Sequence, residues 1–243
     1  MEAQVCLGFR LNVPFWCGFR DPSSSNLHRT FPLPPPATLY GMAAAALGLR
    51  QDDQSRRSEM RFAVAIEKQG EQVESYSKWM KASEPAKGPE DKLAREAIRS
   101  RGNLSPDEAE WVSTTLIRQK IIQPVFIAGL LTGRDTAEEV MQALRSPFFP
   151  LCLGESDDAV DVEILGIEKP EPSQAPATGA VGGVHPGGAL ASLPTRFDPL
   201  KRGKWRLQRW LVTIPFPGGP LPSNNSPQRM ACHGQVWDFE PGA

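Results

Sequence analysis

Apolar residues alternate with polar or small ones in several separate stretches of the chain. The first of these runs from Val5 to Val13. An apolar residue at every second position is the period of a strand with one buried face. The same period predicts strands over about 60–66, 73–79, 160–164 and 205–213. The pattern therefore predicts a sheet assembled from segments spread along the whole chain.

Two other stretches repeat their apolar positions at the spacing of a helix. A first helix is predicted over about 37–47, where Leu39 and Met42 begin one apolar stripe, three prolines lead in and Gly48 ends the run. Residues 136–139 have the form of a capping box in front of a second helix, which stops before Pro147.

Three segments depart from these periods. Residues 75–125 contain a stretch of mixed charge with prolines and are predicted to leave the sheet as an inserted hairpin. Residues 169–192 are rich in Pro, Ala and Gly and are predicted to be a mobile loop outside the core. Its glycines at 179–188 leave two interpretations open, a flexible linker or a loop whose amides approach phosphates. The tail ends in Trp237 and Phe239, which we expect to pack on the body.

The predicted order is strand, helix, strand, strand with an insertion, helix, strand, then additional C-terminal strands. This is the order of α+β domains of the ferredoxin-like or RRM-like kind, a platform often used for RNA. A chain of 243 residues can form one such domain over residues 1–243 with a sizeable core. The fold class alone does not establish RNA binding.

The net charge of −1 conceals a separation of charge along the chain. Residues 155–171 carry seven acids and one lysine, and we expect them to form a solvated hairpin; residues 196–209 carry six Lys or Arg against Asp198. No stretch has the length and hydrophobicity of a membrane span, and the first residues lack the basic start of a signal peptide. A cytoplasmic protein with a local phosphate-binding patch is therefore expected.

Candidate catalytic and metal-binding residues are few. The four cysteines are far apart in sequence and without CxxC spacing, and no histidine stands at zinc-ligand spacing from them. The three histidines, His28, His185 and His233, each lie in a predicted loop. No triad and no paired carboxylates stand out. We therefore expect reduced, structural thiols, no metal, no cofactor and no catalytic residue.

The strongest chemical signal is a set of cations interleaved with Trp205 and Trp210. Cations neutralise phosphates, and aromatic rings and guanidinium planes stack on bases. The alternative is a solvated strand edge whose charges resist aggregation. Weaker signals come from cations on the hairpin, for which an ordinary polar face is the alternative, and from the loop at 14–36. The candidate RNA-binding residues are Arg20, Arg29, Lys78, Lys81, Arg118, Lys120, Arg196, Lys201, Arg202, Lys204 and Arg206.

Two motifs carry a family resemblance. Residues 31–48 read FPLPPPATLYGMAAAALG and residues 144–156 read LRSPFFPLCLGES. Both resemble segments of the Cas-five family, CRISPR-associated proteins of the RAMP superfamily that occur in the antiviral type I Cascade ribonucleoprotein complexes. The resemblance implies a subunit that holds the 5′ handle of the crRNA, caps the backbone filament and contacts both the backbone subunit and the large subunit that reads the PAM. It also implies that residues 75–125 form a thumb, and that target DNA is met only through the complex.

One branch of that family processes precursor crRNA as a metal-independent endonuclease that uses a tyrosine, a lysine and a histidine. This sequence has Thr30 and Phe31 where that branch has its tyrosine, and no histidine lies between His28 and His185. The resemblance is therefore to the non-cleaving branch, and we expect no enzymatic activity. A processing endonuclease and a free-standing RRM-like RNA-binding protein are the alternatives. A subtype I-B assignment is expected, and recruitment of a nuclease-helicase or of a transposition machinery stays open.

Overall fold

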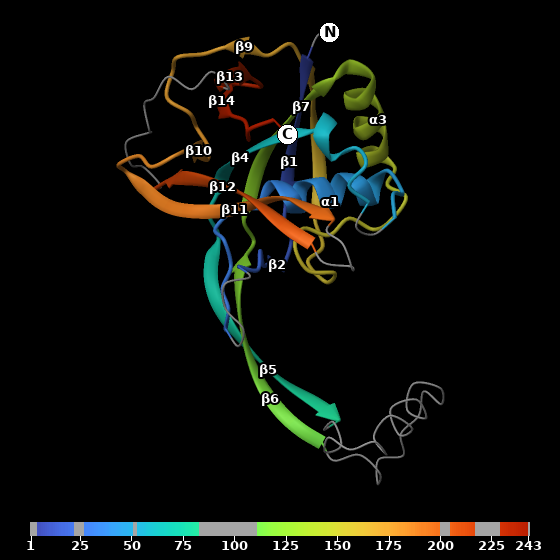
Figure 1. Ribbon diagram of the computed structural model, residues 1–243, viewed down its shortest axis with the longest axis vertical. Helices are drawn as coiled ribbons and strands as arrows, with labels where there is room; N and C mark the ends of the chain where they lie inside the picture. The colour runs from blue at the N-terminus through green and yellow to red at the C-terminus, as the bar shows by residue number, and fades with distance from the viewer. Residues whose placement is uncertain are drawn as a thin grey trace.

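A four-stranded antiparallel sheet with the order β4-β7-β1-β8 forms the centre of the computed structural model (Figure 1). The structure describes residues 4–21, 27–50, 53–82, 111–199, 205–216 and 229–242. The four strands are β1 (Gln4–Asn12), β4 (Arg61–Lys68), β7 (Val125–Gly133) and β8 (Asp161–Glu168). Three of them, β1, β4 and β8, include or overlap a stretch that the alternating pattern marks, and β7 does not.

Two helices, α1 (Pro36–Ala46) and α3 (Arg134–Arg145), cover one face of this sheet. Alternate residues of β1, from Val5 to Leu11, pack with the apolar sides of both helices in the main core. The capping-box prediction was wrong, because α3 begins two residues before Thr136, after Gly133, and no side chain caps it. The element order is α+β and consistent with a RAMP-like fold.

The opposite face of the sheet is covered by the C-terminal hairpin. This hairpin consists of β13 (Arg229–Cys232) and β14 (Gln235–Asp238), with the short β9 (Glu171–Pro172) beside β13. Trp237 and Phe239 are buried against Cys6, Ile127 and neighbouring residues in a second core cluster. The prediction that the tail packs on the body is thus confirmed.

A third sheet contradicts the prediction of a mobile loop at 169–192. Its order is β10-β12-β11, with β10 (Val181–Gly182), β11 (Gly188–Pro199) and β12 (Trp205–Pro215). Ala180 and Val181 are buried. The glycines allow this burial: a Cβ on Gly179 would lie 2.2 Å from the carbonyl oxygen of Val64, and the Gly182 N–H donates to Asp238 Oδ2 at 2.7 Å. Packing accounts for these two glycines, and an approach of this loop's amides to phosphates stays a prediction.

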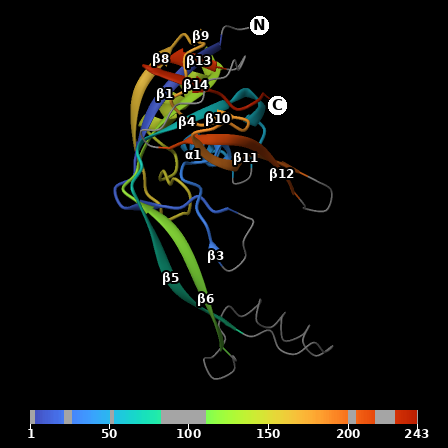
Figure 2. The ribbon, with the colours of Figure 1, turned by 90° about the vertical axis from the view of Figure 1, so that its left-hand side faces the viewer.

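The β5–β6 hairpin extends away from the body (Figures 1 and 2). Strand β5 (Glu71–Ala82) pairs antiparallel with β6 (Trp111–Ile122). At its base β6 also pairs with β2 (Trp16–Cys17) and β3 (Leu27–His28) from the loop before α1. The short helix η1 (Arg57–Glu59) precedes β4. None of the described helices is long and apolar enough to cross a membrane.

Candidate nucleic-acid interface

The loop before α1 folds back onto the base of the β5–β6 hairpin. Strand β3 is parallel to β6 and pairs His28 with Arg118, while an isolated bridge joins Arg20 to Thr30. Arg20 and Arg29 are exposed. The pKa of His28 is lowered, first by partial burial and then by the charges of Arg20 and Arg118. The structure thus brings together cations predicted from two separate segments, the loop at 14–36 and the hairpin. We call Arg20, Arg29 and Arg118 the hairpin-base group.

Lys120 has a different environment from these arginines. Its side chain is 9% exposed, and Nζ lies 2.7 Å from Asp158 Oδ1 and 2.8 Å from Glu155 Oε2. Burial by itself lowers the pKa of Lys120, but the hydrogen bonds that Lys120 donates to the two carboxylates, together with their charges, outweigh burial and raise it. Because this charge is already paired inside the fold, we leave Lys120 out of the proposed interface. Arg118 Nη1 also lies 3.0 Å from Glu155 Oε2, at a more exposed position.

Asp158 fixes this arrangement from the loop before β8. Its side chain is fully buried, and its Oδ2 accepts the backbone N–H groups of Gly18 and Glu155, each at 2.9 Å. The prediction of a solvated acidic hairpin over 155–171 was therefore wrong near the start of that segment, at Asp158. Oxygens of Glu155, Asp157 and Asp158 do lie within 4.8 Å of one another. Two of these three carboxylates bond to Lys120, so its ammonium already fills the role that a metal ion would have.

The ribbon β11–β12 carries the second group of cations. Arg196 Nε lies 2.5 Å from Asp198 Oδ1, and Gln208 Nε2 donates to Asp198 Oδ2 at 2.6 Å; these hydrogen bonds lower the pKa of Asp198. Arg206 and Arg209 are exposed. We call Arg196, Arg206 and Arg209 the ribbon group. Trp210, from the same strand, is 6% exposed and belongs to the core, so it is not placed for stacking on a base.

Five predicted cations cannot be placed relative to either group. Lys78 and Lys81 lie on β5, where their backbones pair with Thr115 and Val112. Their side chains fall outside the part of the chain that the structure describes. The whole residues Lys201, Lys204 and Arg202, between β11 and β12, fall outside it too. The role of these five in RNA binding stays a prediction.

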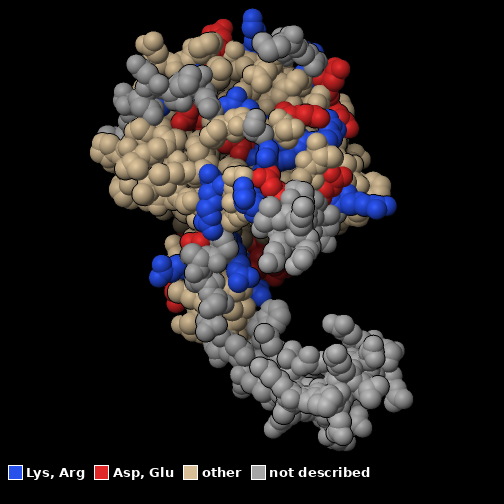
Figure 3. All heavy atoms as spheres, viewed as in Figure 1, with Lys and Arg blue, Asp and Glu red and all other residues tan. Residues whose placement is uncertain are grey.

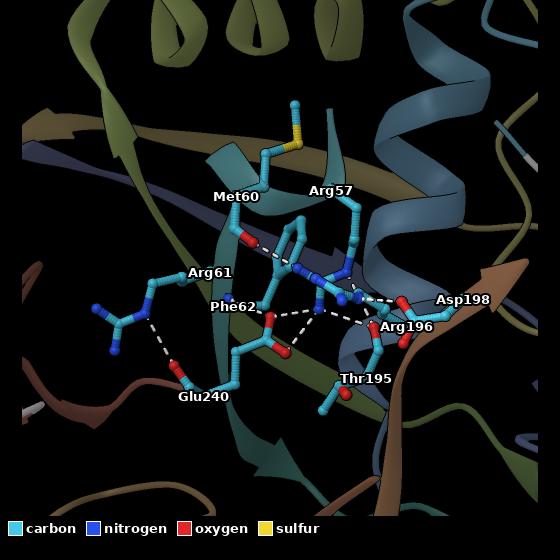
Figure 4. A network of polar contacts seen from close by, with 8 residues as sticks. All are labelled: Arg57, Met60, Arg61, Phe62, Thr195, Arg196, Asp198 and Glu240. Atoms are coloured by element: carbon cyan, nitrogen blue, oxygen red, sulfur yellow. Dashed lines mark hydrogen bonds and ion pairs between the residues drawn. The ribbon is translucent and has the colours of Figure 1, made fainter. Parts of the chain in front are cut away.

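A cavity of about 300 Å³ beside β11 and β12 is lined by two arginines that the sequence pattern did not single out, Arg57 and Arg61. Arg196 and Arg209 line it too. Arg57 is 6% exposed, and its Nη2 lies 2.6 Å from both carboxylate oxygens of Glu240 (Figure 4). Sequence reasoning missed this pair because 183 residues separate its members.

Arg57 also donates to the carbonyl oxygen of Thr195 on β11, and Glu240 Oε1 accepts the N–H of Phe62 on β4 (Figure 4). We call the Arg57–Glu240 pair with these bonds the C-terminal clamp. It joins η1, β4, β11 and the last residues of the described chain. The clamp therefore holds the ribbon, with Arg196 directly after Thr195, against the central sheet.

Lys and Arg side chains form a broken band on one face of the molecule (Figure 3). The band extends from the body to the base of the β5–β6 hairpin. Polyanions bind such surfaces by displacing counterions, and separated cations along a band suit a backbone of spaced phosphates. The geometry can therefore hold a nucleic-acid strand.

The α+β architecture is shared with a solved structure entitled "CRISPR RNA-guided surveillance complex". The similarity has a TM-score of 0.54 at 16% identity and covers 89% of this chain and 90% of that one. Two further structures are similar at lower scores. "Crystal structure of Cas protein" has a TM-score of 0.45, 18% identity and coverage of 86% and 95%. "Cryo-EM structure of the Type III-B Cmr-beta bound to cognate target RNA and AMPPnP, state 1" has 0.47, 9% identity and coverage of 95% and 85%.

The family model described as "CRISPR-associated protein (Cas_Cas5)" matches residues 6–217. Because the match covers most of the chain, the protein belongs to this CRISPR-associated family. The family resemblance of the two motifs is confirmed. Comparison with curated proteins found no match.

Proposed function

We propose that this protein is a non-catalytic RNA-binding subunit of a type I CRISPR Cascade complex. Its membership of the Cas5 family carries the proposal. The strand order β4-β7-β1-β8, with α1 and α3 on one face, supports a ferredoxin-like platform for RNA. The exposed cations of the hairpin-base and ribbon groups supply the charge that such a role needs.

The bound RNA would be the 5′ handle of the crRNA. Arg20 and Arg29 are exposed on the loop that β6 holds in place, so their guanidinium groups can reach phosphates without giving up buried partners. The handle is a single strand, and proteins recognise such strands by phosphate contacts together with stacking. Pairing between guide and target would then read the DNA sequence, while this subunit reads the handle.

The β5–β6 hairpin would act as the thumb that contacts the adjoining backbone subunit. It extends well beyond the body (Figure 2). Tyr76 on β5 is 68% exposed. Tyrosine is enriched in protein interfaces because its ring buries apolar area and its hydroxyl keeps a hydrogen bond. The subunit would thereby cap the filament, beside the large subunit.

A structural role is also favoured by Phe31. It stands where the cleaving branch of the family has its tyrosine, and its ring is 7% exposed in the main core. A phenyl ring has no proton to give or take, so it cannot take part in general acid–base chemistry.

The test is to purify the protein with the products of its neighbouring genes and to sequence the RNA that purifies with it. We expect a stable complex that contains crRNA. In parallel, the isolated protein is incubated with repeat RNA in the absence of metal, and the RNA should stay intact. Cutting at one position of the repeat would replace this proposal with the processing-endonuclease function. Binding of unrelated cellular RNAs without other subunits would favour a free-standing RNA-binding protein.

A further inference from the structure

The second core cluster contains a group of metal-ligating side chains that sequence spacing concealed. Ligand atoms of Cys6, Cys232 and His233 all lie within 4.8 Å of one another. Cys6 is 0% and Cys232 6% exposed, and the His233 side chain is 3% exposed. Cys6 lies on β1, while the other two lie at the end of β13. Residues near the two ends of the chain thus bring two thiols and one imidazole together in a buried group.

His233 is held over this position by the tight turn of the C-terminal hairpin. It is one of two non-glycine residues with positive φ among those described, at 52°, and with Gly234, at φ 69°, it forms the two-residue turn between β13 and β14. Its ring lies over Gly8, where a Cβ would come within 2.5 Å of the ring carbon Cδ2. A type I′ hairpin turn requires positive φ at both of its central residues, so the turn itself sets this conformation and directs the ring toward β1.

Each ring nitrogen of His233 has one oxygen nearby. Nδ1 lies 3.4 Å from Glu168 Oε1, and Nε2 lies 3.1 Å from the carbonyl oxygen of Cys6. A neutral imidazole donates its one N–H to one of these oxygens and keeps a lone pair on the other nitrogen, which is the atom that could bind a metal ion. Glu168 Oε2 additionally accepts the backbone N–H of His233 at 2.6 Å, which fixes the carboxylate beside the ring. A carboxylate on the other ring nitrogen is the usual neighbour of a metal-bound histidine.

We propose that Cys6, Cys232 and His233 form a binding site for a zinc-class transition-metal ion that joins the first strand to the C-terminal hairpin. Two thiolates and one imidazole form a ligand set that suits Zn²⁺. Three protein ligands leave one tetrahedral position for water or for the Glu168 carboxylate. Binding releases the thiol protons to solvent, and because the unfolded chain has no preformed site, the ion stabilises the fold. The proposal is independent of RNA binding.

The test uses the full chain, stripped of metal under reducing conditions and titrated with Co²⁺ and then with Zn²⁺. We expect one Co²⁺ per chain, with the visible absorption bands of tetrahedral cobalt and the charge-transfer bands of cobalt–thiolate bonds. Zn²⁺ should displace the cobalt and raise the melting temperature. If the wild-type protein shows neither thiolate bands nor a rise in melting temperature, the proposal is wrong, whether the two thiols are free or joined in a disulfide.

Variants separate the ligands from general effects on folding. C232S and H233N should lose the cobalt bands; asparagine is chosen because it tolerates the left-handed conformation. Cys17→Ser is the matched control, since Cys17 is also fully buried but lies outside the group, and it should keep one ion per chain. E168Q should weaken Zn²⁺ binding by roughly 10- to 100-fold. Unchanged binding by both C232S and H233N, with circular dichroism showing that they are folded, would overturn the assignment.

Discussion

The base of the hairpin and the C-terminal clamp each bury one cation, but the carboxylates that pair with the two cations are buried to different degrees. In the clamp, Arg57 and Glu240 are 6% and 2% exposed, and the guanidinium also bonds to backbone carbonyls. At the hairpin base, Lys120 meets the fully buried Asp158 and also Glu155, which is 28% exposed. Both regions lie next to exposed arginines. The comparison shows that burial from water, rather than position in the sequence, decides whether a cation stabilises the fold or remains available to bind a ligand.

Breaking the clamp should have the largest effect on stability. Arg57→Met removes the guanidinium and leaves the Glu240 carboxylate buried without its counter-charge. We expect a loss of about 3–5 kcal/mol in the free energy of unfolding, the usual cost of removing one partner of a buried pair. Denaturant titration would measure it.

The neighbouring Arg56 provides the control. Its partners, Glu59 and Glu139, are 51% and 53% exposed. Because water screens such pairs, Arg56→Met should cost only about 0–1 kcal/mol. Equal losses for the two variants would contradict the distinction between buried and surface cations.

Removing Lys120 should cost less than breaking the clamp. Lys120→Met strands Asp158, but that carboxylate keeps two backbone N–H donors and Glu155 is partly solvated. We expect a loss of about 3 kcal/mol, the lower end of the range for a broken buried pair. Asp158→Asn should be similarly destabilising, since it leaves the Lys120 ammonium with one carboxylate.

The pH dependence of that loss provides a second measurement. The pKa of Lys120 is raised in the folded protein, so its contribution is fully present below the unfolded pKa of about 10.4. The contribution is lost as pH rises through the folded pKa. The stability difference between the wild type and Lys120→Met should therefore be constant from neutral pH to about pH 10 and shrink only above it. A difference that disappears at lower pH would mean that another group is responsible.

The spacing of apolar residues predicted those strands and helices whose formation depends on the local sequence. Alternation located β1, β4, β8 and β12, and helical spacing located α1 to within one residue at each end. The same reasoning failed at 169–192, because glycine and proline content was interpreted as mobility. There the missing side chain of Gly179 instead permits the contact with Val64.

The candidate sites depended on contacts that no local pattern contains. Lys120 looked like a neighbour of Arg118 on a polar face, and only the position of Asp158, 38 residues later, shows that it is buried. Cys6 and Cys232 were judged too far apart in sequence for a metal site, yet the packing of β13 on the central sheet brings them together. The adjacent residues Cys232 and His233 were the signal that a spacing rule overlooked.

The smallest expected effects concern the exposed cations, and they test whether these residues remain available for RNA. Arg20→Ala, Arg29→Ala and Arg206→Ala should leave the melting temperature nearly unchanged, because their side chains are exposed. In the assembled complex each should weaken handle-RNA binding and lower the slope of log K against log salt concentration by about 0.7, the value for one phosphate contact on a single strand. Lys120→Met is the matched contrast, since it should destabilise the fold while leaving that slope unchanged once binding is measured on folded protein. If the three arginine variants keep the wild-type slope and Lys120→Met lowers it, then the buried lysine opens toward the RNA in the complex and the exposed arginines are a solvated surface.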